Sequence, residues 1–211
     1  MTTRRSLTRR TTALAAVAAA AVVLAACGAN DGADSAHSVH GAATPPAATA
    51  PGGQGANGEH NTADSAFATG MIPHHRQAVE MADLAATRAG SAEVKKLAAE
   101  IKQAQDPEIR TLSGWLTAWG EPVPAADGGH GGHSMNGMMT AEEMDRLDKA
   151  SGKAFDTAFL TMMVKHHEGA VTMAEAERSG GAYQPAKDMA GAIVTSQSAE
   201  ISRMKAMLGT S

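Results

Sequence analysis

Cysteine is almost absent from this sequence: Cys27 is the only one among 211 residues. A single thiol excludes intramolecular disulfides and cysteine-based metal sites. Aromatic residues make up only 3% of the chain, whereas alanine and methionine are plentiful, a composition that favours helices over sheets. The net charge is −4 and no basic stripe is present, so we expect no nucleic-acid partner.

The first 27 residues have the pattern of a processing segment. Arginines precede a short apolar stretch at 13–26, which is too short to cross a membrane comfortably. The stretch ends in Leu-Ala-Ala-Cys, which looks like a lipobox. We therefore predict a lipoprotein signal peptide at 1–27, lipidation of Cys27, and export to the outer face of the cell membrane. The alternative is an ordinary secretory signal with an incidental cysteine.

Residues 28–63 contain much Ala, Gly, Pro and Thr and almost no large apolar side chains. Such a segment cannot bury enough surface to fold, so we predict a flexible tether. Its histidines are expected to be solvated linker residues: His37, His40 and His60.

The rest of the chain, 64–211, contains an internal duplication with an offset of 92 residues. Copy one spans 64–119 and copy two spans 156–208. Each copy has two stretches of helical periodicity separated by a glycine-containing turn, which predicts a helical hairpin. The connector, 120–155, contains a capping box at Thr140 that predicts a short helix. We predict an all-α four-helix bundle made of two duplicated hairpins, plus the connector helix.

Prolines and glycines also predict local features of copy one. Pro73 should kink the first helix or delay its start, and Pro107 should bend or divide the second. Gly90 is expected at the position after the first helix, with Ser91 as the N-cap of the next.

An adjacent histidine pair with methionine one turn upstream recurs in both copies. Counted from the turn, His74 lies 16 residues before Gly90 and Glu108 lies 18 after it, so the motif should face Glu108. The residues placed together in this way are His74, His75, Gln105 and Glu108 in copy one, and His166, His167, Gln197 and Glu200 in copy two.

Two interpretations fit these buried polar residues. Each glutamate could hydrogen-bond a histidine while the methionines fill the core. Alternatively, histidine and methionine bind a metal ion, with the glutamine and glutamate residues as outer partners or alternative ligands. The duplication of the whole motif favours the metal.

The ligand types point to copper, because Met and His without thiolate suit this soft ion better than Mg or Ca, although other transition metals also accept them. A second cluster of the same types lies in the glycine-rich part of the connector. It could capture metal as an auxiliary site or be a plain solvated linker. Its members are His130, His133, Met135, Met138 and Met139.

The pattern Met-x-x-His-His-x-x-Ala-Val-x-Met-Ala, followed by Gln-x-x-Glu-Ile, resembles domain-of-unknown-function family 305 over 64–208. This resemblance implies a ferritin-like four-helix fold in a protein that is usually exported, with copper binding and copper tolerance in some members. Matched residue by residue, it implies the ligands Met71, His74, His75, Met163, His166 and His167, with Met81 and Met173 as further candidates.

Three functions follow from these patterns. The first is a lipid-anchored copper-binding protein that sequesters or delivers the ion. The second is a ferritin-like di-metal oxidase using Glu108, Glu200 and the histidine pairs, although adjacent histidines fit the usual Glu-x-x-His layout poorly. The third is a structural or partner-binding bundle without metal. No catalytic residues and no particular protein partner are predicted.

Overall fold

The structure, a computed structural model, describes residues 59–126 and 136–209. Within these ranges it contains no strand and five helices, which confirms the predicted all-α class: α1 (Thr62–Arg88), α2 (Ala92–Trp119), α3 (Ala141–Lys149), α4 (Gly152–Gly180) and α5 (Gln184–Leu208). Some residues of interest lie outside the described ranges: Cys27, His37, His40, His130, His133 and Met135.

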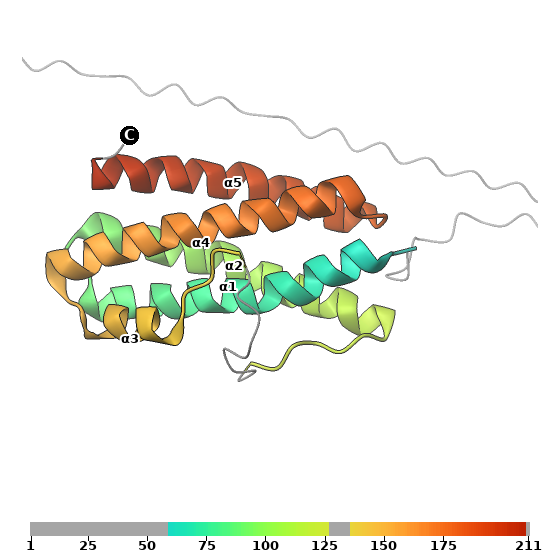
Figure 1. The fold of residues 1–211 in the computed structure, drawn as a ribbon, viewed down its shortest axis with the longest axis horizontal. Coiled ribbons are helices and arrows are strands. Elements are labelled where there is room, and N and C mark those ends of the chain that lie inside the picture. The colour runs from blue at the N-terminus through green and yellow to red at the C-terminus, as the bar shows by residue number, and fades with distance from the viewer. Residues whose placement is uncertain (1–58, 127–135, 210–211) are drawn as a thin grey trace, which may run out of the picture. The chain divides into compact units, whose positions relative to one another are not determined.

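The long helices form two antiparallel hairpins, α1–α2 and α4–α5, that pack against each other through α1 and α4 (Figure 1). Helices α1 and α4 run in opposite directions (Figure 1). The short helix α3 packs beside α1 and α4. An ion pair between Arg203 and Glu100 joins α5 to α2. The arrangement is the predicted pair of duplicated hairpins with a connector helix.

The apolar interior consists of two separate cores. The Phe67 core takes the first part of α1 and the second part of α4, whereas the Phe159 core takes the second part of α1 and the first part of α4. Polar side chains are buried between the two cores on all four long helices. We call these six residues the polar layer: His74, His75, Gln105, His166, His167 and Gln197.

The helix starts follow the predicted capping chemistry. Ser91 accepts a hydrogen bond from the Val94 amide at the start of α2, and Thr140 forms the predicted capping box of α3. Asn61 forms a further capping box at the start of α1. Helix α1 therefore starts well before Pro73 and continues through it, so the predicted late start is wrong.

Helix α2 continues through Pro107, so the predicted division there is wrong. Gly90 directly follows the C-cap residue Ala89, which is its predicted position after the first helix. It does not adopt the left-handed conformation usual for a glycine at that position. Gly90 is required for close packing instead, since a Cβ there would lie 2.9 Å from the backbone of Gly152.

Two aspartates, one buried (Asp64) and one partly buried (Asp156), tie the hairpins together in a symmetric way. Asp156, at the start of the second copy, accepts hydrogen bonds of 2.9 Å from two backbone amides in the turn of the first hairpin. Asp64 accepts bonds of 3.1 and 3.0 Å from the equivalent amides in the turn of the second. The donors are Gly90 and Ser91 for Asp156, and Ala182 and Tyr183 for Asp64. Each copy thus fixes the turn of the other.

His60 differs from the predicted solvated linker residue. Its ring stacks on that of Trp119, with 4.3 Å between the centroids, and its Nε2 lies 3.4 Å from the Glu121 carboxylate. The end of the predicted tether therefore packs on the bundle. Among the described residues, no helix combines the length and apolar character that crossing a membrane requires.

Candidate metal centre

The histidine pairs of the two copies meet at the middle of the bundle. All four imidazoles are fully buried. The rings of His74 and His166 face each other across the α1–α4 contact, with centroids 3.8 Å apart and an angle of 43° between their planes. The structure therefore brings together the two motifs that the sequence places in separate copies.

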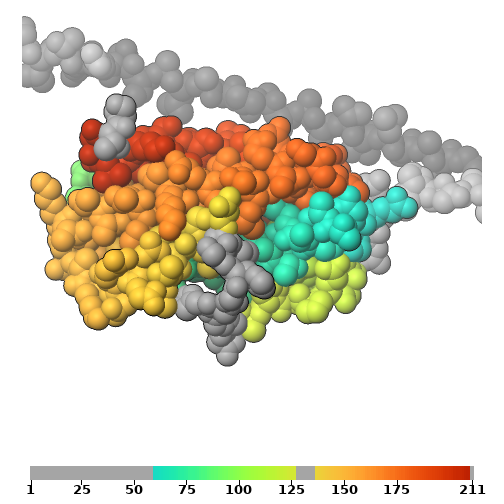
Figure 2. All heavy atoms as spheres, in the orientation of Figure 1, coloured from blue at the N-terminus to red at the C-terminus, as the bar shows by residue number. Residues whose placement is uncertain are grey.

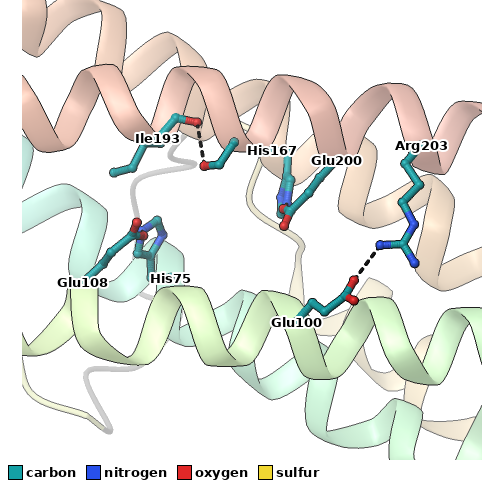
Figure 3. Close-up of polar contacts among 8 residues, drawn as sticks. His75, Glu100, Glu108, His167, Ile193, Glu200 and Arg203 are labelled. Atoms are coloured by element: carbon teal, nitrogen blue, oxygen red, sulfur yellow. Dashed lines mark hydrogen bonds and ion pairs between the residues drawn. The ribbon is translucent and has the colours of Figure 1, made fainter. Parts of the chain in front are cut away.

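The second histidine of each pair contacts a glutamate within its own hairpin (Figure 3). The His75 Nε2 lies 2.7 Å from the Glu108 carboxylate, and the His167 Nε2 lies 2.6 Å from that of Glu200. Because an ionised carboxylate can only accept, each imidazole donates through Nε2–H. The Nδ1 atom of each ring is buried and has no hydrogen-bond partner among the described residues. Pro107 does not disturb this contact, which is the same in both copies.

The first histidine of each pair is held less tightly. His74 donates through Nε2–H to the backbone carbonyl of Asn136 at 3.2 Å, so it has the same tautomer as His75. Among residues 59–126 and 136–209, neither ring nitrogen of His166 has a hydrogen-bond partner. The Nδ1 atoms of all four histidines are consequently buried and unpartnered within the described structure.

Burial favours the neutral form of the two central imidazoles, His74 and His166. It lowers the pKa of His74 to about 3, and a charge on the neighbouring His75 would lower it further. Burial also lowers the pKa of His166 well below its ordinary value, with additional repulsion from His74. Neutral imidazole nitrogens are the form that binds transition metals.

The donor atoms fit a soft or borderline ion. Buried polar atoms are normally hydrogen-bonded, so four unpartnered Nδ1 atoms at one level of a bundle need an explanation. Each histidine that contacts a glutamate shows the outer-shell arrangement typical of metal ligands. Gln105 and Gln197, at the same level, each have a buried and unpartnered side-chain oxygen.

The methionines differ in their relation to the polar layer. Met71 and Met163 are fully buried one turn before their histidines, Met71 in the Phe67 core and Met163 in the Phe159 core. They therefore border the layer from opposite sides. Met81 and Met173 lie about two turns after His74 and His166, roughly 10 Å along the helix axis, and so belong to the flanking cores.

The connector contributes a methionine to the apolar interior. Met139 is buried in the Phe159 core, while Met138 is partly buried. Within 59–126 and 136–209, no group of three or more His, Cys, Asp or Glu side chains is arranged to hold an ion. A site in the polar layer would therefore combine imidazoles with thioethers.

Three residues beside the polar layer escaped the sequence analysis: Gln77, Asn136 and Gly169. Gln77 and Gly169 occupy the same position in the two copies, yet one is long and polar and the other has no side chain. That difference within an otherwise matched motif is the signal that could have identified Gln77 and Gly169.

The chain is similar to several solved structures. A DUF305 protein from Streptomyces coelicolor, described as secreted, is 36% identical, with a TM-score of 0.64; the match covers 70% of this chain and 92% of that one. CopM in its Cu(II)-bound form is 36% identical, with a TM-score of 0.60, over 69% of this chain and 94% of its own. CopM also matches in Cu(I)-bound, silver-bound and apo forms.

A DUF305 fragment from Deinococcus radiodurans is 28% identical, with a TM-score of 0.64, over 72% of this chain and 99% of its own. No curated protein matches the chain. The model of the family "Domain of unknown function (DUF305)" matches residues 64–208, which include both copies of the His-His motif. By this match and by its likeness to the solved members, the chain belongs to the DUF305 family.

Proposed function

We propose that this protein is an exported, lipid-anchored copper-binding protein that sequesters or delivers copper as its cargo. The observation that carries the proposal is the polar layer: four buried imidazoles whose Nδ1 atoms have no hydrogen-bond partner among the described residues, bordered by Met71 and Met163. A layer with no ligand would leave these nitrogens unsatisfied, at a cost of about 1–3 kcal/mol each. Binding an ion there removes that cost.

Two of the similar proteins support this assignment. CopM binds Cu(II) and Cu(I) in its solved forms, which supports a soft or borderline metal as the cargo. The Streptomyces coelicolor protein is described as secreted, which supports a location outside the cytoplasm.

The surrounding residues suit a positive ion. Glu108 and Glu200 orient the rings of His75 and His167 and place two negative charges beside the layer. The side chains of the two glutamates are 22% exposed, so the carboxylates keep contact with water, whereas the histidine rings hydrogen-bonded to them are fully buried. Charge compensation is thus available without burying an isolated carboxylate.

The auxiliary cluster in the connector is a separate part of the proposal. His130, His133, Met135, Met138 and Met139 supply the same donor types as the layer. We assign to them the first capture of copper before transfer to the interior. Only Met138 and Met139 fall within the described residues, and Met139 has a role in the Phe159 core.

No observation favours the oxidase or a metal-free structural role above copper binding. In the structure each glutamate is hydrogen-bonded to a histidine of its own hairpin, whereas di-metal carboxylate proteins carry a Glu on each of two helices and a Glu-x-x-His motif on each of the other two. Oxygen-dependent turnover of the loaded protein would distinguish an oxidase from a carrier.

Replacing Met71 and Met163 together with leucine should weaken Cu(I) binding more than Zn(II) binding. Leucine is close in volume, so the cost in stability should stay below about 1.5 kcal/mol. We expect Cu(I) affinity to fall about tenfold or more, because the soft ion benefits most from the thioether. Competition titrations with each metal measure this.

The matched control is Met144→Leu, which changes a buried methionine of α3 in the Phe159 core, outside the polar layer. Its Cu(I) affinity should equal that of the parent. A parent that binds no Cu(I), or a double variant that binds it as tightly as the parent, would contradict the proposed function.

Replacing Cys27 with serine should release the protein from the membrane fraction, because the lipobox at the end of 1–27 would lose its lipidated side chain. Fractionation of cells that express the parent and the variant measures this. A variant that sediments with membranes as fully as the parent would show that the anchor is not at Cys27.

A further inference from the structure

Residues 136–139, which we call the strap, lie across the helices that carry the central histidines. In Figure 2 the part of the connector that begins at residue 136, in yellow, lies over α4, in orange, and beside α1, in cyan. The strap reaches His74, whose Nε2–H donates to the Asn136 carbonyl. It therefore lies over the His74–His166 pair on the α1–α4 side of the bundle.

The strap is held at one end by Gln77. The Gln77 side-chain amide donates to the Met139 carbonyl at 2.9 Å, and its carbonyl accepts from the Met139 amide at 2.7 Å. Both groups of this pair are buried, and Gln77 is only 3% exposed. One side chain thus satisfies both backbone groups of a connector residue.

At the other end, the strap is held by glycine packing. A Cβ on Gly169 would overlap the carbonyl oxygen of Asn136 and lie 2.9 Å from the Gly137 Cα. A Cβ on Gly137 would lie 2.6 Å from the carbonyl oxygen of Lys165, and its φ of +84° is rare for other residues. Only glycine at both positions allows backbone to pack on backbone here.

The duplication shows that this contact is specific. Gln77 and Gly169 occupy the same position in their copies, three residues after His74 and His166. One extends a side chain to bind the strap, and the other lacks a side chain and so leaves room for it. The two otherwise similar halves differ where the strap crosses them.

The strap also makes the two central histidines inequivalent. His74 is hydrogen-bonded to Asn136, whereas the ring nitrogens of His166 have no partner in the part of the chain that the structure describes. All four imidazoles are fully buried, so an ion from solvent must displace part of their cover. Counted over the described residues, three hydrogen bonds hold the strap over the pair, far fewer than hold a packed helix.

We propose that the strap is the displaceable cover of the copper site. When the strap lifts, copper reaches His166 and then His74. While the strap is closed, the Asn136 carbonyl positions the His74 ring. This inference rests on the proposed function for the identity of the cargo. The rival path runs past Glu108 and Glu200, whose carboxylates reach solvent on the α2 and α5 side.

The test uses Gly169→Ala, which expels the strap without changing any proposed ligand. Its matched control is Gly191→Ala in the interior of α5, where the added Cβ would have no neighbour closer than 3.9 Å. A second variant, Gln77→Ala, removes two strap hydrogen bonds and keeps a strong helix former in α1. Circular dichroism first establishes that each variant is folded.

The first readout is the rate at which the protein takes Cu(I) from its bicinchoninate complex in stopped flow. We expect Gly169→Ala and Gln77→Ala to accelerate uptake by about tenfold or more, the change expected from losing one or two ordinary hydrogen bonds in the closed state. Gly191→Ala should stay within about twofold of the parent. Equal rates in all four proteins would overturn the strap as the route and favour the carboxylate side.

The second readout needs no metal. Nitrogen-15 NMR of the histidine rings should show His74 of the parent as the Nε2–H tautomer and show a loss of this preference in Gly169→Ala. An unchanged His74 signal would overturn the positioning role of Asn136. If the parent takes up no Cu(I) at all, the proposed function fails, while this readout still decides whether the strap holds His74.

Discussion

Replacing His74 and His166 together with glutamine should abolish the stabilisation that copper gives to the parent protein. An ion that binds only the folded chain stabilises it by about 2.7 kcal/mol at a hundredfold excess over its dissociation constant. The double variant removes the two imidazoles that meet at the centre of the bundle. Among the described residues the ring nitrogens of His166 have no hydrogen-bond partner within ordinary geometry, and glutamine is compatible with a helix, so the helices should be preserved. Calorimetric melts with and without Cu(I) measure the difference.

The matched control for this pair is His60→Gln. His60 also lies in an aromatic contact, with Trp119, but on the surface at the start of α1. Its copper-induced shift should equal that of the parent. A shift of the same size in the parent, the control and the double variant would show that copper binds elsewhere and that the central histidines are structural.

The second large effect concerns pH and the buried pair Asp64 and Glu177. Burial raises the pKa of Glu177 to about 8, and the neighbouring Asp64 acts in the same direction. Burial also acts to raise the pKa of Asp64, but the neighbouring Glu177 and hydrogen bonds from backbone amides outweigh it, so the net pKa is lowered. At neutral pH Glu177 therefore carries a proton while Asp64 is ionised.

This proton makes the folded state lose stability as pH rises. The folded pKa of Glu177, about 8, lies above its ordinary value of 4.5, so the native state binds more protons than the unfolded chain in that window. The free energy of unfolding should fall through this range by at most about 1.4 kcal/mol per pH unit and level off above it. The lowered pKa values of His74 and His166 have the opposite effect below about pH 6.5. The unfolded chain then binds more protons than the native state, so the free energy of unfolding falls as the pH decreases.

Urea unfolding between pH 7 and 9 isolates the carboxyl pair from the histidines. We expect the parent to lose stability across this range and Glu177→Gln to lose much less, because the amide is close in size to the carboxyl group but carries no titrating proton. Glu175→Gln, at an exposed position on the same helix, should keep the slope of the parent. Parallel curves for the parent and Glu177→Gln would show that Glu177 is not protonated in the folded state.

The sequence predicted the hairpins and the level of the site because both depend on local spacing. Counting from Gly90 placed the His-His motif opposite Glu108, and the structure confirms that level. It could not tell which histidine of the pair contacts the glutamate. Neighbouring residues on a helix point about 100° apart, and the packing of α1 on α4 decides which ring faces which partner. The result is His75 with Glu108, and His74 with His166.

Contacts between the copies were beyond prediction from spacing. The proximity of Asp64 and Glu177 arises from the packing of the first copy on the second, and the position in copy one equivalent to Glu177 is an alanine, Ala85. The strap depends on where a long connector returns to the bundle, which no periodicity specifies. The sequence predicts a capping role for Gly90 because glycine is common after a helix end. The structure shows instead that a glycine is needed there because the backbone of Gly152 lies too close for a side chain.

The most direct test of the account is a crystal structure of the copper-loaded protein with diffraction data at the copper absorption edge. The central claim is that the polar layer binds the ion through imidazole Nδ1 atoms and neighbouring thioethers. It predicts an anomalous peak within bonding distance of the Nδ1 of His166, between the Phe67 and Phe159 cores. Peaks confined to connector histidines or to the protein surface, with the layer unchanged, would contradict it.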